Sequence, residues 1–281
     1  MWDLTALYEK LWKGLSNMDK IIVSIAPCKA GEPVCAEKLA EDVKQCANLG
    51  ASMVHLHCRL PDGSLSADTS YMKKCFEKIG EKADLVFQAS TGGVSDMNIK
   101  ERCNPLFYQR VESASLNAGS TNMGNDVYIN SEAEIMYCSK MIYEHKIIPD
   151  IEVFDIGMIH NIERLKTKIP FREPVYYNLV FGHLGGMQAQ PEDLTAFRSL
   201  IPGNARWGVT HYGRDNWTFL AMAIAMGAST VRIGFEDSAW ISETKEANYN
   251  YQLMERLSSI IRAMGREMAT PQEARRMMGV L

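Results

Sequence analysis

The chain has 281 residues, too many for a minimal domain and close to the usual size of a single α/β barrel. Apolar residues make up 46% and charged residues 23%, a balance that excludes a disordered chain and predicts one large hydrophobic core. The net charge of −4 and the scattered basic residues offer no positive field for nucleic acid, so we do not expect nucleic acid as a partner.

Cysteine usage and the absence of targeting patterns indicate the cellular compartment. The seven cysteines are odd in number and include no Cys-x-x-Cys pair, which argues against a disulfide framework and against a thiolate zinc site. No apolar run approaches the roughly 18 residues of a membrane span, and the N-terminus lacks a signal-peptide pattern. We therefore expect a cytoplasmic protein that does not associate with membranes.

Residues 1–19 carry tryptophan, leucine and tyrosine side chains at helical spacing. This pattern predicts a helical extension in front of the catalytic domain. Its apolar face needs a partner, which is either the bottom of the domain or a neighbouring subunit. Because nothing in the segment can do chemistry, we assign it no catalytic part.

From Lys20 onward, short β-branched runs alternate with amphipathic helical stretches, which predicts parallel strands with helices outside them. The expected strands are 21–25, 53–57, 85–89, 111–116, 151–154, 176–180, 207–210 and 230–234. The expected helices include 36–47, 71–79, 132–144, 191–200, 217–226 and 248–264. Eight such units predict a (β/α)8 TIM barrel over residues 20–281. An open doubly wound sheet is less favoured because residues 26–31 contain no Gly-rich dinucleotide turn.

The second expected strand ends in His55 and His57, which stand two residues apart. Side chains alternate along a strand, so both imidazoles point to the same side. A single histidine here would more often be a satisfied core residue, whereas two imidazoles on one barrel rim can share a metal ion. Since catalytic groups of such barrels come from the carboxyl ends of strands, the pair indicates a catalytic metal site.

The eighth expected strand is followed by Glu236 and Asp237 and contains Arg232. Glu236 can complete a set of two histidines and one carboxylate, which leaves coordination positions open for substrate. We expect one zinc ion per chain, and manganese or cobalt also accept such a set. Asp237 remains for proton transfer. The alternative, that the two acids only cap the following helix, leaves His55, His57 and Arg232 unexplained.

The remaining strand ends are polar and open to two interpretations each. Residues 88–93 combine hydroxyls with glycine amides, which suits a carboxylate or carbonyl oxygen or forms only a tight turn. Residues 113–122 form a substrate loop or a solvated loop. Glu152 and Asp155 are pocket residues or structural ion-pair partners. The Gly- and Arg-containing runs 182–186 and 211–214 resemble anion-contacting loops.

Five stretches in this order resemble the β-keto acid cleavage enzymes. They are 55–59, 90–93, 115–119, 234–237 and 269–275, with the sequences HLHCR, STGG, SLNAG, GFED and ATPQEAR. The resemblance runs from about Lys20 to the C-terminus. It implies a zinc-dependent (β/α) barrel, usually a homotetramer, that reacts a β-keto acid with acetyl-CoA to give acetoacetate and a new CoA thioester.

The resemblance also implies roles for individual residues, in agreement with the reading of the strand ends. The metal ligands fall on His55, His57 and Glu236, and the general base and its orienting arginine on Asp237 and Arg232. Substrate contacts fall on a third set, made up of Ser90, Gly93 and Ser115.

The chain departs from the family after the first strand, where the segment 28–35 is short and lacks a proline-rich stretch. The amine-recognising member has an acid there, whereas here Lys29 stands near that place and Glu32 slightly beyond it. If Lys29 faces the substrate tail, its ammonium favours a neutral or acidic β-keto acid such as 3-oxoadipate; if Glu32 does, the preference turns to an amine.

Two alternative functions remain at this point. A metallohydrolase of the amidohydrolase type also uses His-x-His, but places the pair on its first strand and adds histidines from the fifth and sixth. Here the pair lies on the second strand, and neither 151–154 nor 176–180 contains a histidine. A non-catalytic metabolite-binding barrel is disfavoured because both Glu236 and Asp237 are present.

Overall fold

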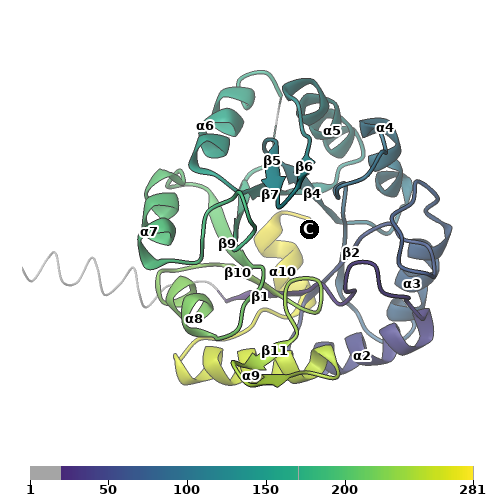
Figure 1. Cartoon of the computed structure of the whole chain (residues 1–281), viewed down its shortest axis with the longest axis vertical. Coiled ribbons are helices and arrows are strands. Elements are labelled where there is room, and N and C mark those ends of the chain that lie inside the picture. The colour runs from purple at the N-terminus through teal and green to yellow at the C-terminus, as the bar shows by residue number, and fades with distance from the viewer. Residues whose placement is uncertain (1–19, 170, 281) are drawn as a thin grey trace, which may run out of the picture.

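The structure, a computed structural model, describes residues 20–169 and 171–280 and is built on eight parallel strands that close into one barrel (Figure 1). The strands are β1 (Ile22–Ile25), β2 (Met53–Leu56), β3 (Val86–Ala89), β4 (Ser113–Asn117), β7 (Ile148–Val153), β8 (Tyr176–Phe181), β9 (Arg206–His211) and β10 (Thr230–Ile233). β1 closes the barrel by pairing with β10 on one side and with β2 on the other. The predicted (β/α)8 barrel is therefore confirmed.

Helices surround the barrel because each crossover between parallel strands contains an apolar stripe that packs inward against the strands. They are α2 (Ala36–Asn48), α3 (Ser70–Gly80), α5 (Glu132–Glu144), α6 (Ile156–Leu165), α7 (Pro191–Leu200), α8 (Thr218–Ala225) and α9 (Asn250–Ala263). In α2, for example, Leu39, Val43 and Cys46 are buried at helical spacing. α5 begins with a capping box in which Ser131 and Glu134 bond each other's backbone amides.

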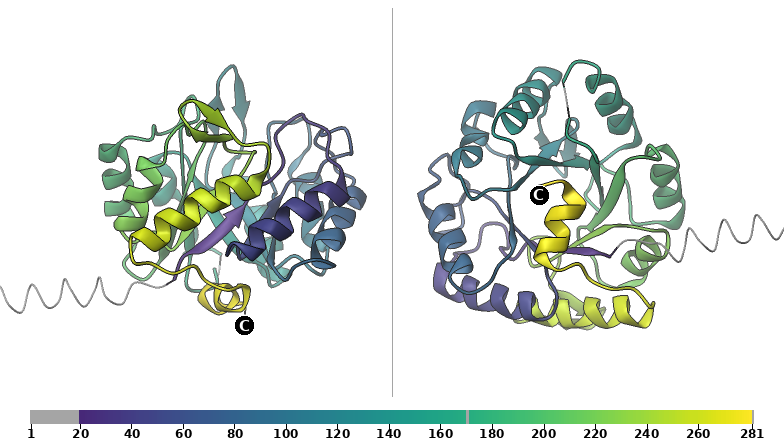
Figure 2. Two further views of the ribbon diagram at one scale, coloured as in Figure 1. Left: turned by 90° about the horizontal axis from the view of Figure 1, so that it is seen from below. Right: turned by 180° about the vertical axis from the view of Figure 1, so that it is seen from behind.

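Smaller elements decorate the two ends of the barrel. At the carboxyl ends of the strands lie a hairpin of β5 (Thr121–Met123) and β6 (Asp126–Tyr128) and a hairpin of β11 (Trp240–Ser242) and β12 (Lys245–Glu246), while the short helices α4 (Ile99–Arg102) and η1 (Asn104–Phe107) form the crossover from β3 to β4. At the opposite end, α10 (Pro271–Met278) crosses the bottom of the barrel (Figure 2).

The observed elements differ from the expected ones in the middle of the chain. The fifth barrel strand begins at Ile148, three residues earlier than expected, because the pairing with β4 starts where Ser113 faces Ile148. Helix α6 follows it and was absent from the expected helices. Asp155, which we considered as a pocket acid or an ion-pair partner, caps this helix by accepting a hydrogen bond from the Gly157 amide at 2.8 Å. The helical extension expected at residues 1–19 lies outside the described residues.

Helix α10 closes the bottom of the barrel with an apolar contact and an ion-pair network. Ala274 and Met278 pack on side chains of the barrel interior, among them Ile22 and Tyr176. The Arg275 guanidinium binds carboxylates of Asp84 and Glu112 and the Leu85 carbonyl, at donor to acceptor distances of 2.6 to 3.1 Å. A planar guanidinium with five donors suits such a fork, so Arg275 fixes α10 to the starts of β3 and β4. Among the described residues, no helix is both long and apolar enough to cross a membrane.

We predict that Arg275→Met lowers the free energy of unfolding by about 1–3 kcal/mol, because two carboxylates lose their charged hydrogen-bond donor. Chemical denaturation of the purified protein measures the change. The matched control is Arg276→Met, since Arg276 is the exposed neighbour on the same helix and should stay within about 0.5 kcal/mol of wild type. Equal effects of the two substitutions would show that the network does not stabilise the barrel.

Candidate metal centre and active-site cavity

The closure of the barrel brings the ends of β2 and β10 together across the short strand β1. His57 Nε2 lies 3.2 Å from Glu236 Oε1, and His55 Nε2 lies 3.7 Å from the same oxygen. Gly234 makes this approach possible. Its φ is +142°, and a Cβ atom there would stand 2.1 Å from the Ala26 carbonyl oxygen. The chain after β10 can therefore pass directly over the end of β1 and deliver Glu236 to the histidines.

Hydrogen bonds on the far side of each imidazole set the same tautomer in both histidines. His55 Nδ1 lies 2.8 Å from Gln88 Oε1, and His57 Nδ1 lies 3.1 Å from the Gly92 carbonyl oxygen. Both partners are acceptors, so each Nδ1 carries the proton and donates it. Each Nε2 is then an unprotonated nitrogen facing Glu236, which is the form that binds a metal ion.

Burial and neighbouring charges favour the protonation states in which His55, His57 and Glu236 can bind a cation. His55 is buried, which lowers its pKa to about 3 and keeps its imidazole neutral, and its Nε2 has no hydrogen-bond partner. Burial alone would raise the pKa of Glu236, but nearby positive charge, that of Arg232 included, outweighs it and holds that pKa well below its usual range. A buried nitrogen without a partner beside an ionised carboxylate is the donor set of a divalent metal site.

The spacing of the donor atoms agrees with that chemistry. One ligand atom from each of His55, His57 and Glu236 lies within 4.8 Å of the others, and no other trio of His, Cys, Asp or Glu in the described part of the chain does so. Ligands bound about 2.0 to 2.1 Å from a tetrahedral zinc ion stand about 3.3 Å apart, so small adjustments of side chains would suffice. The residues present therefore fit a metal ion with two histidines and one carboxylate.

A chain of buried polar side chains supports His55 from inside the barrel. Gln88 donates its amide hydrogens to Ser113 Oγ and Asp150 Oδ2, both at 3.1 Å. Asn178 donates to the same Asp150 oxygen at 3.2 Å and accepts from Thr210 at 3.0 Å. The Gln88 amide is thereby fixed with its oxygen toward His55. The sequence reading assigned no role to Gln88, Asp150 or Asn178, because their importance depends on facing each other across the barrel.

Arg232 lies among three acids on the other side of the ligand set. Its guanidinium donates to both oxygens of Asp237, at 3.1 and 2.6 Å, and lies 3.4 Å from Glu236 and 3.5 Å from Glu152. Burial raises the pKa of Asp237, which Arg232 opposes, and burial raises the pKa of Glu152 to about 8. A carboxyl group with a pKa of about 8 is mostly protonated at neutral pH, so Arg232 faces the charges of Glu236 and Asp237, and a cation at the ligand set would offset the negative charge that one guanidinium leaves.

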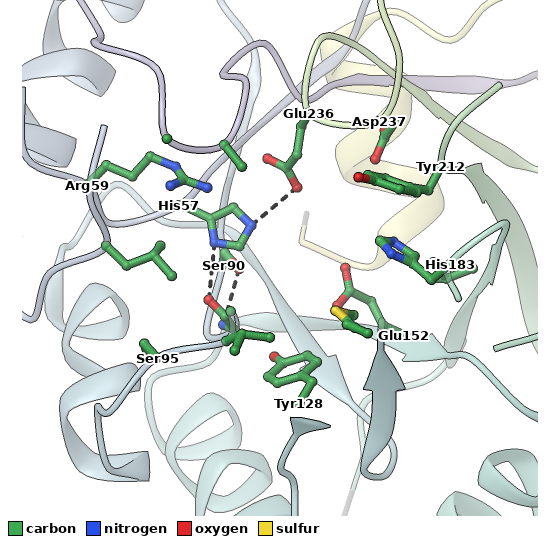
Figure 3. Close-up of a pocket in the computed structure, with 18 of the residues that line it drawn as sticks. His57, Arg59, Ser90, Ser95, Tyr128, Glu152, His183, Tyr212, Glu236 and Asp237 are labelled. Atoms are coloured by element: carbon green, nitrogen blue, oxygen red, sulfur yellow. Dashed lines mark hydrogen bonds and ion pairs between the residues drawn. The ribbon is translucent and has the colours of Figure 1, made fainter. Parts of the chain in front are cut away.

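A cavity of about 1030 Å³ opens above these residues (Figure 3). Seven of the residues singled out individually from the sequence line it, namely His57, Ser90, Gly93, Glu152, Arg232, Glu236 and Asp237. Ser115 does not. It is buried behind the loop 90–93, where its Oγ accepts a hydrogen bond from the Thr91 amide at 3.1 Å. The structure thus gives Ser115 a supporting position beneath the cavity wall.

Lys29 and Glu32 also lie outside the cavity lining. Their side chains form an ion pair with each other, with Lys29 Nζ 2.6 Å from Glu32 Oε1, and each side chain is 59% exposed. The residues between them, Ala30 and Gly31, do line the cavity. The loop after β1 therefore borders the substrate space, while its two charges neutralise each other at the rim.

Several lining residues come from segments whose role the sequence left open. Tyr128 enters from β6, and His183 stacks on Tyr212 with ring centroids 4.0 Å apart. The loop 211–214 resembles an anion-binding loop in sequence, but Arg214 is buried and lies 3.7 Å over the Trp217 ring rather than in the cavity. The sequence contains no pattern that would connect the hairpin β5–β6 to the second and third strands.

Comparison with known proteins assigns this chain to a family. The model of the beta-keto acid cleavage enzyme family matches residues 28–280. The chain is 35% identical to the 3-keto-5-aminohexanoate cleavage enzyme of Acetoanaerobium sticklandii over 94% of this chain and 99% of that protein. It is 28% identical to the 3,5-dioxohexanoate:acetyl-CoA acetone transferase of Paraburkholderia graminis over 94% of this chain and 97% of the other.

Among solved structures, ObcA superposes with a TM-score of 0.74 at 16% identity, over 88% of this chain and 67% of ObcA, which supports the fold. The match of the family model over nearly the whole chain and the identity with curated members agree with the placement of the strand-end residues. The chain belongs to the β-keto acid cleavage enzyme family.

Proposed function

We propose that this protein is a zinc-dependent enzyme that exchanges acyl groups between a β-keto acid and acetyl-CoA. The observation that carries the proposal is the meeting of His55, His57 and Glu236 in one cavity with the Asp237–Arg232 pair. The names of two relatives specify acetyl-CoA as co-substrate. A metallohydrolase or a non-catalytic barrel is not supported, because the chain belongs to a family of carbon–carbon cleavage enzymes.

The proposed reaction conserves all atoms and uses no oxidant. The bond between the β-carbonyl carbon and the methylene carbon of the β-keto acid breaks, and the acetyl carbon of acetyl-CoA takes its place on that methylene carbon. The products are acetoacetate and the CoA thioester of the remaining acyl group. The substrate must therefore lose a proton from its methylene carbon and later pass through a retro-Claisen cleavage.

The protein's own residues account for binding and proton transfer. A zinc ion held by His55, His57 and Glu236 would supply a Lewis acid for the β-keto oxygen. Asp237 faces the same cavity and is held by both nitrogens of one side of the Arg232 guanidinium, so its carboxylate is positioned as the base that takes the methylene proton. Arg232 keeps that base oriented and charged.

We extend the proposal to the substrate contacts, the cellular location and the assembly. Ser90 and Gly93 lie in the cavity wall and would contact the substrate, with Ser115 supporting them from behind. The family resemblance supports a homotetramer. The cysteine pattern supports a reducing compartment such as the cytoplasm, since all seven thiols are free.

The metal assignment predicts about one zinc ion per chain in the purified wild-type protein. His57→Ala should lose most of it after dialysis, because two ligands rarely hold zinc against buffer. Elemental analysis by mass spectrometry measures the content. His160→Ala removes an exposed histidine on α6 and should retain the wild-type value. Unchanged zinc in the His57 variant would remove this residue from the ligand set.

The assignment of the base predicts that Asp237→Asn keeps its zinc but loses on the order of 100-fold or more in kcat. Acetoacetate formation from acetyl-CoA and a panel of β-keto acids measures turnover. Asp215→Asn changes an exposed acid nearby in the sequence and should leave kcat close to wild type. Near-normal kcat in the Asp237 variant would move the base to Glu152, and Glu152→Gln would then show the large loss.

The Lys29–Glu32 ion pair at the cavity rim leads to opposite predictions for its two residues about the preferred charge of the substrate tail. Glu32→Ala leaves the Lys29 ammonium unpaired and should raise kcat/KM for an acidic β-keto acid such as 3-oxoadipate relative to a cationic one such as 3-keto-5-aminohexanoate. Lys29→Ala leaves the carboxylate unpaired and should shift the ratio the other way. Because both groups are exposed, we expect shifts of about threefold to tenfold. Ratios that move together in the two variants, or not at all, would show that the tail does not reach this pair.

A further inference from the structure

Two backbone amides of the loop 90–93, those of Thr91 and Gly92, are already bonded to hydroxyl oxygens. The Thr91 amide donates to Ser115 Oγ and the Gly92 amide to Ser90 Oγ, both at 3.1 Å. The next amide, that of Gly93, is directed at the Tyr128 hydroxyl. The Thr91 and Gly92 amides therefore have partners. The further donors that this wall can offer to a ligand include hydroxyl hydrogens.

Two side chains present a hydroxyl group to the cavity from this wall, and Tyr128 is the larger of the two. It ends β6, is only 4% exposed and lines the cavity, with its ring directed at the loop 90–93 (Figure 3). Gly92 allows this approach, since a Cβ atom there would stand 1.9 Å from the Tyr128 hydroxyl oxygen. A residue other than glycine at this position would push the hydroxyl away from the loop.

The hydroxyl hydrogen of Tyr128 has no acceptor among the described residues. Arg102 Nη2 donates to the Tyr128 oxygen at 3.3 Å, and the Gly93 amide approaches the same oxygen. Both neighbours are donors, so the phenolic hydrogen cannot bond to either of them. Burial raises the pKa of Tyr128 to about 12, so the hydrogen is present at neutral pH. A buried donor of this kind needs an acceptor in the cavity.

Arg102 adds a buried positive charge behind this hydroxyl. Its guanidinium is bonded to neutral oxygens: the carbonyls of Thr91 and Ile129 at 2.9 and 3.0 Å, the side-chain oxygen of Asn130, and the Tyr128 hydroxyl. Within the described residues no acid forms an ion pair with it. A buried cation without a counter-ion favours an anion on the cavity side of the tyrosine, and its donation also makes the phenol a stronger donor.

We propose that the Tyr128 hydroxyl donates a hydrogen bond to the carboxylate of the β-keto acid, with Arg102 supplying the charge behind it. The inference rests on the proposed function. The keto oxygen belongs on the side of His57 and Glu236, whereas Tyr128 lies beyond Ser90 from those ligands (Figure 3). The carboxylate is the anionic group that all β-keto acid substrates share. Tyr128 thereby becomes a substrate-binding residue beside Ser90 and Gly93.

The test compares an acid and its ester. Binding of acetoacetate and of methyl acetoacetate to zinc-loaded protein is measured by calorimetry for wild type and Tyr128→Phe. A cavity of about 1030 Å³ has room for the added methyl group. Loss of a hydrogen bond to a charged acceptor should weaken acetoacetate binding about tenfold or more, and ester binding by at most about threefold. In turnover, KM should rise for the β-keto acid and stay unchanged for acetyl-CoA.

Tyr143→Phe is the matched control, since it removes a hydroxyl from an exposed tyrosine on α5 that does not line the cavity. It should leave binding of both ligands unchanged. Equal losses for acid and ester in Tyr128→Phe, or no loss, would overturn the inference while the proposed function stands. If wild-type protein binds no β-keto acid and forms no acetoacetate, the proposed function fails first and the inference fails with it.

Discussion

The arrangement around the Arg232 guanidinium is the constraint on which the rest of the site depends. Three carboxylates converge on it inside the barrel mouth, and each would be costly to bury without a cation. Arg232 belongs to the strand next to β1, so its side chain stays in the barrel interior through backbone pairing rather than through a mobile loop. The proposed metal ligand Glu236 and the proposed base Asp237 can therefore stand side by side.

The two histidines are oriented by hydrogen-bond acceptors of two different kinds. His57 follows its strand and uses a backbone carbonyl as its acceptor, whereas His55 lies within β2 and needs an acceptor inside the barrel. Gln88 provides it, held in turn by Asp150 and Asn178 from strands on the far side. The interior of this barrel is thus polar at the level of the metal site and apolar at the bottom, where α10 packs. That gradient separates the chemistry from the part of the core that stabilises the fold.

The sequence predicted the features that depend on local spacing. Alternation along β2 placed His55 and His57 on one face, and the run after β10 supplied Glu236 and Asp237, so the trio was visible before the fold was known. Features that depend on distant segments were not predictable in the same way. The acceptor Gln88 needs a neighbouring strand to give it a role, and Tyr128 reaches the site only because a hairpin folds back over the loop 90–93.

The same limit explains the residues whose expected positions changed. Lys29 and Glu32 were considered as alternatives for the substrate tail, but a turn of the loop after β1 makes them partners of each other. Ser115 was expected at the substrate, but the Thr91 amide uses its hydroxyl. In both cases a local partner satisfies a polar group that the sequence alone shows as free, and only three-dimensional contacts reveal that partner.

The β5–β6 hairpin lies outside the barrel's hydrogen-bonded ring, yet it contributes part of the cavity wall. Its register does not constrain the strands that carry the metal ligands, and its connection to the wall runs through the Arg102 fork and the hydroxyl of Tyr128. If Tyr128 binds the substrate as proposed, mutations in the hairpin alter which molecules are accepted without changing the pairing of the barrel strands. In evolutionary terms, ligand preference and the proposed metal chemistry would then be carried by separable parts of the chain that can diverge independently.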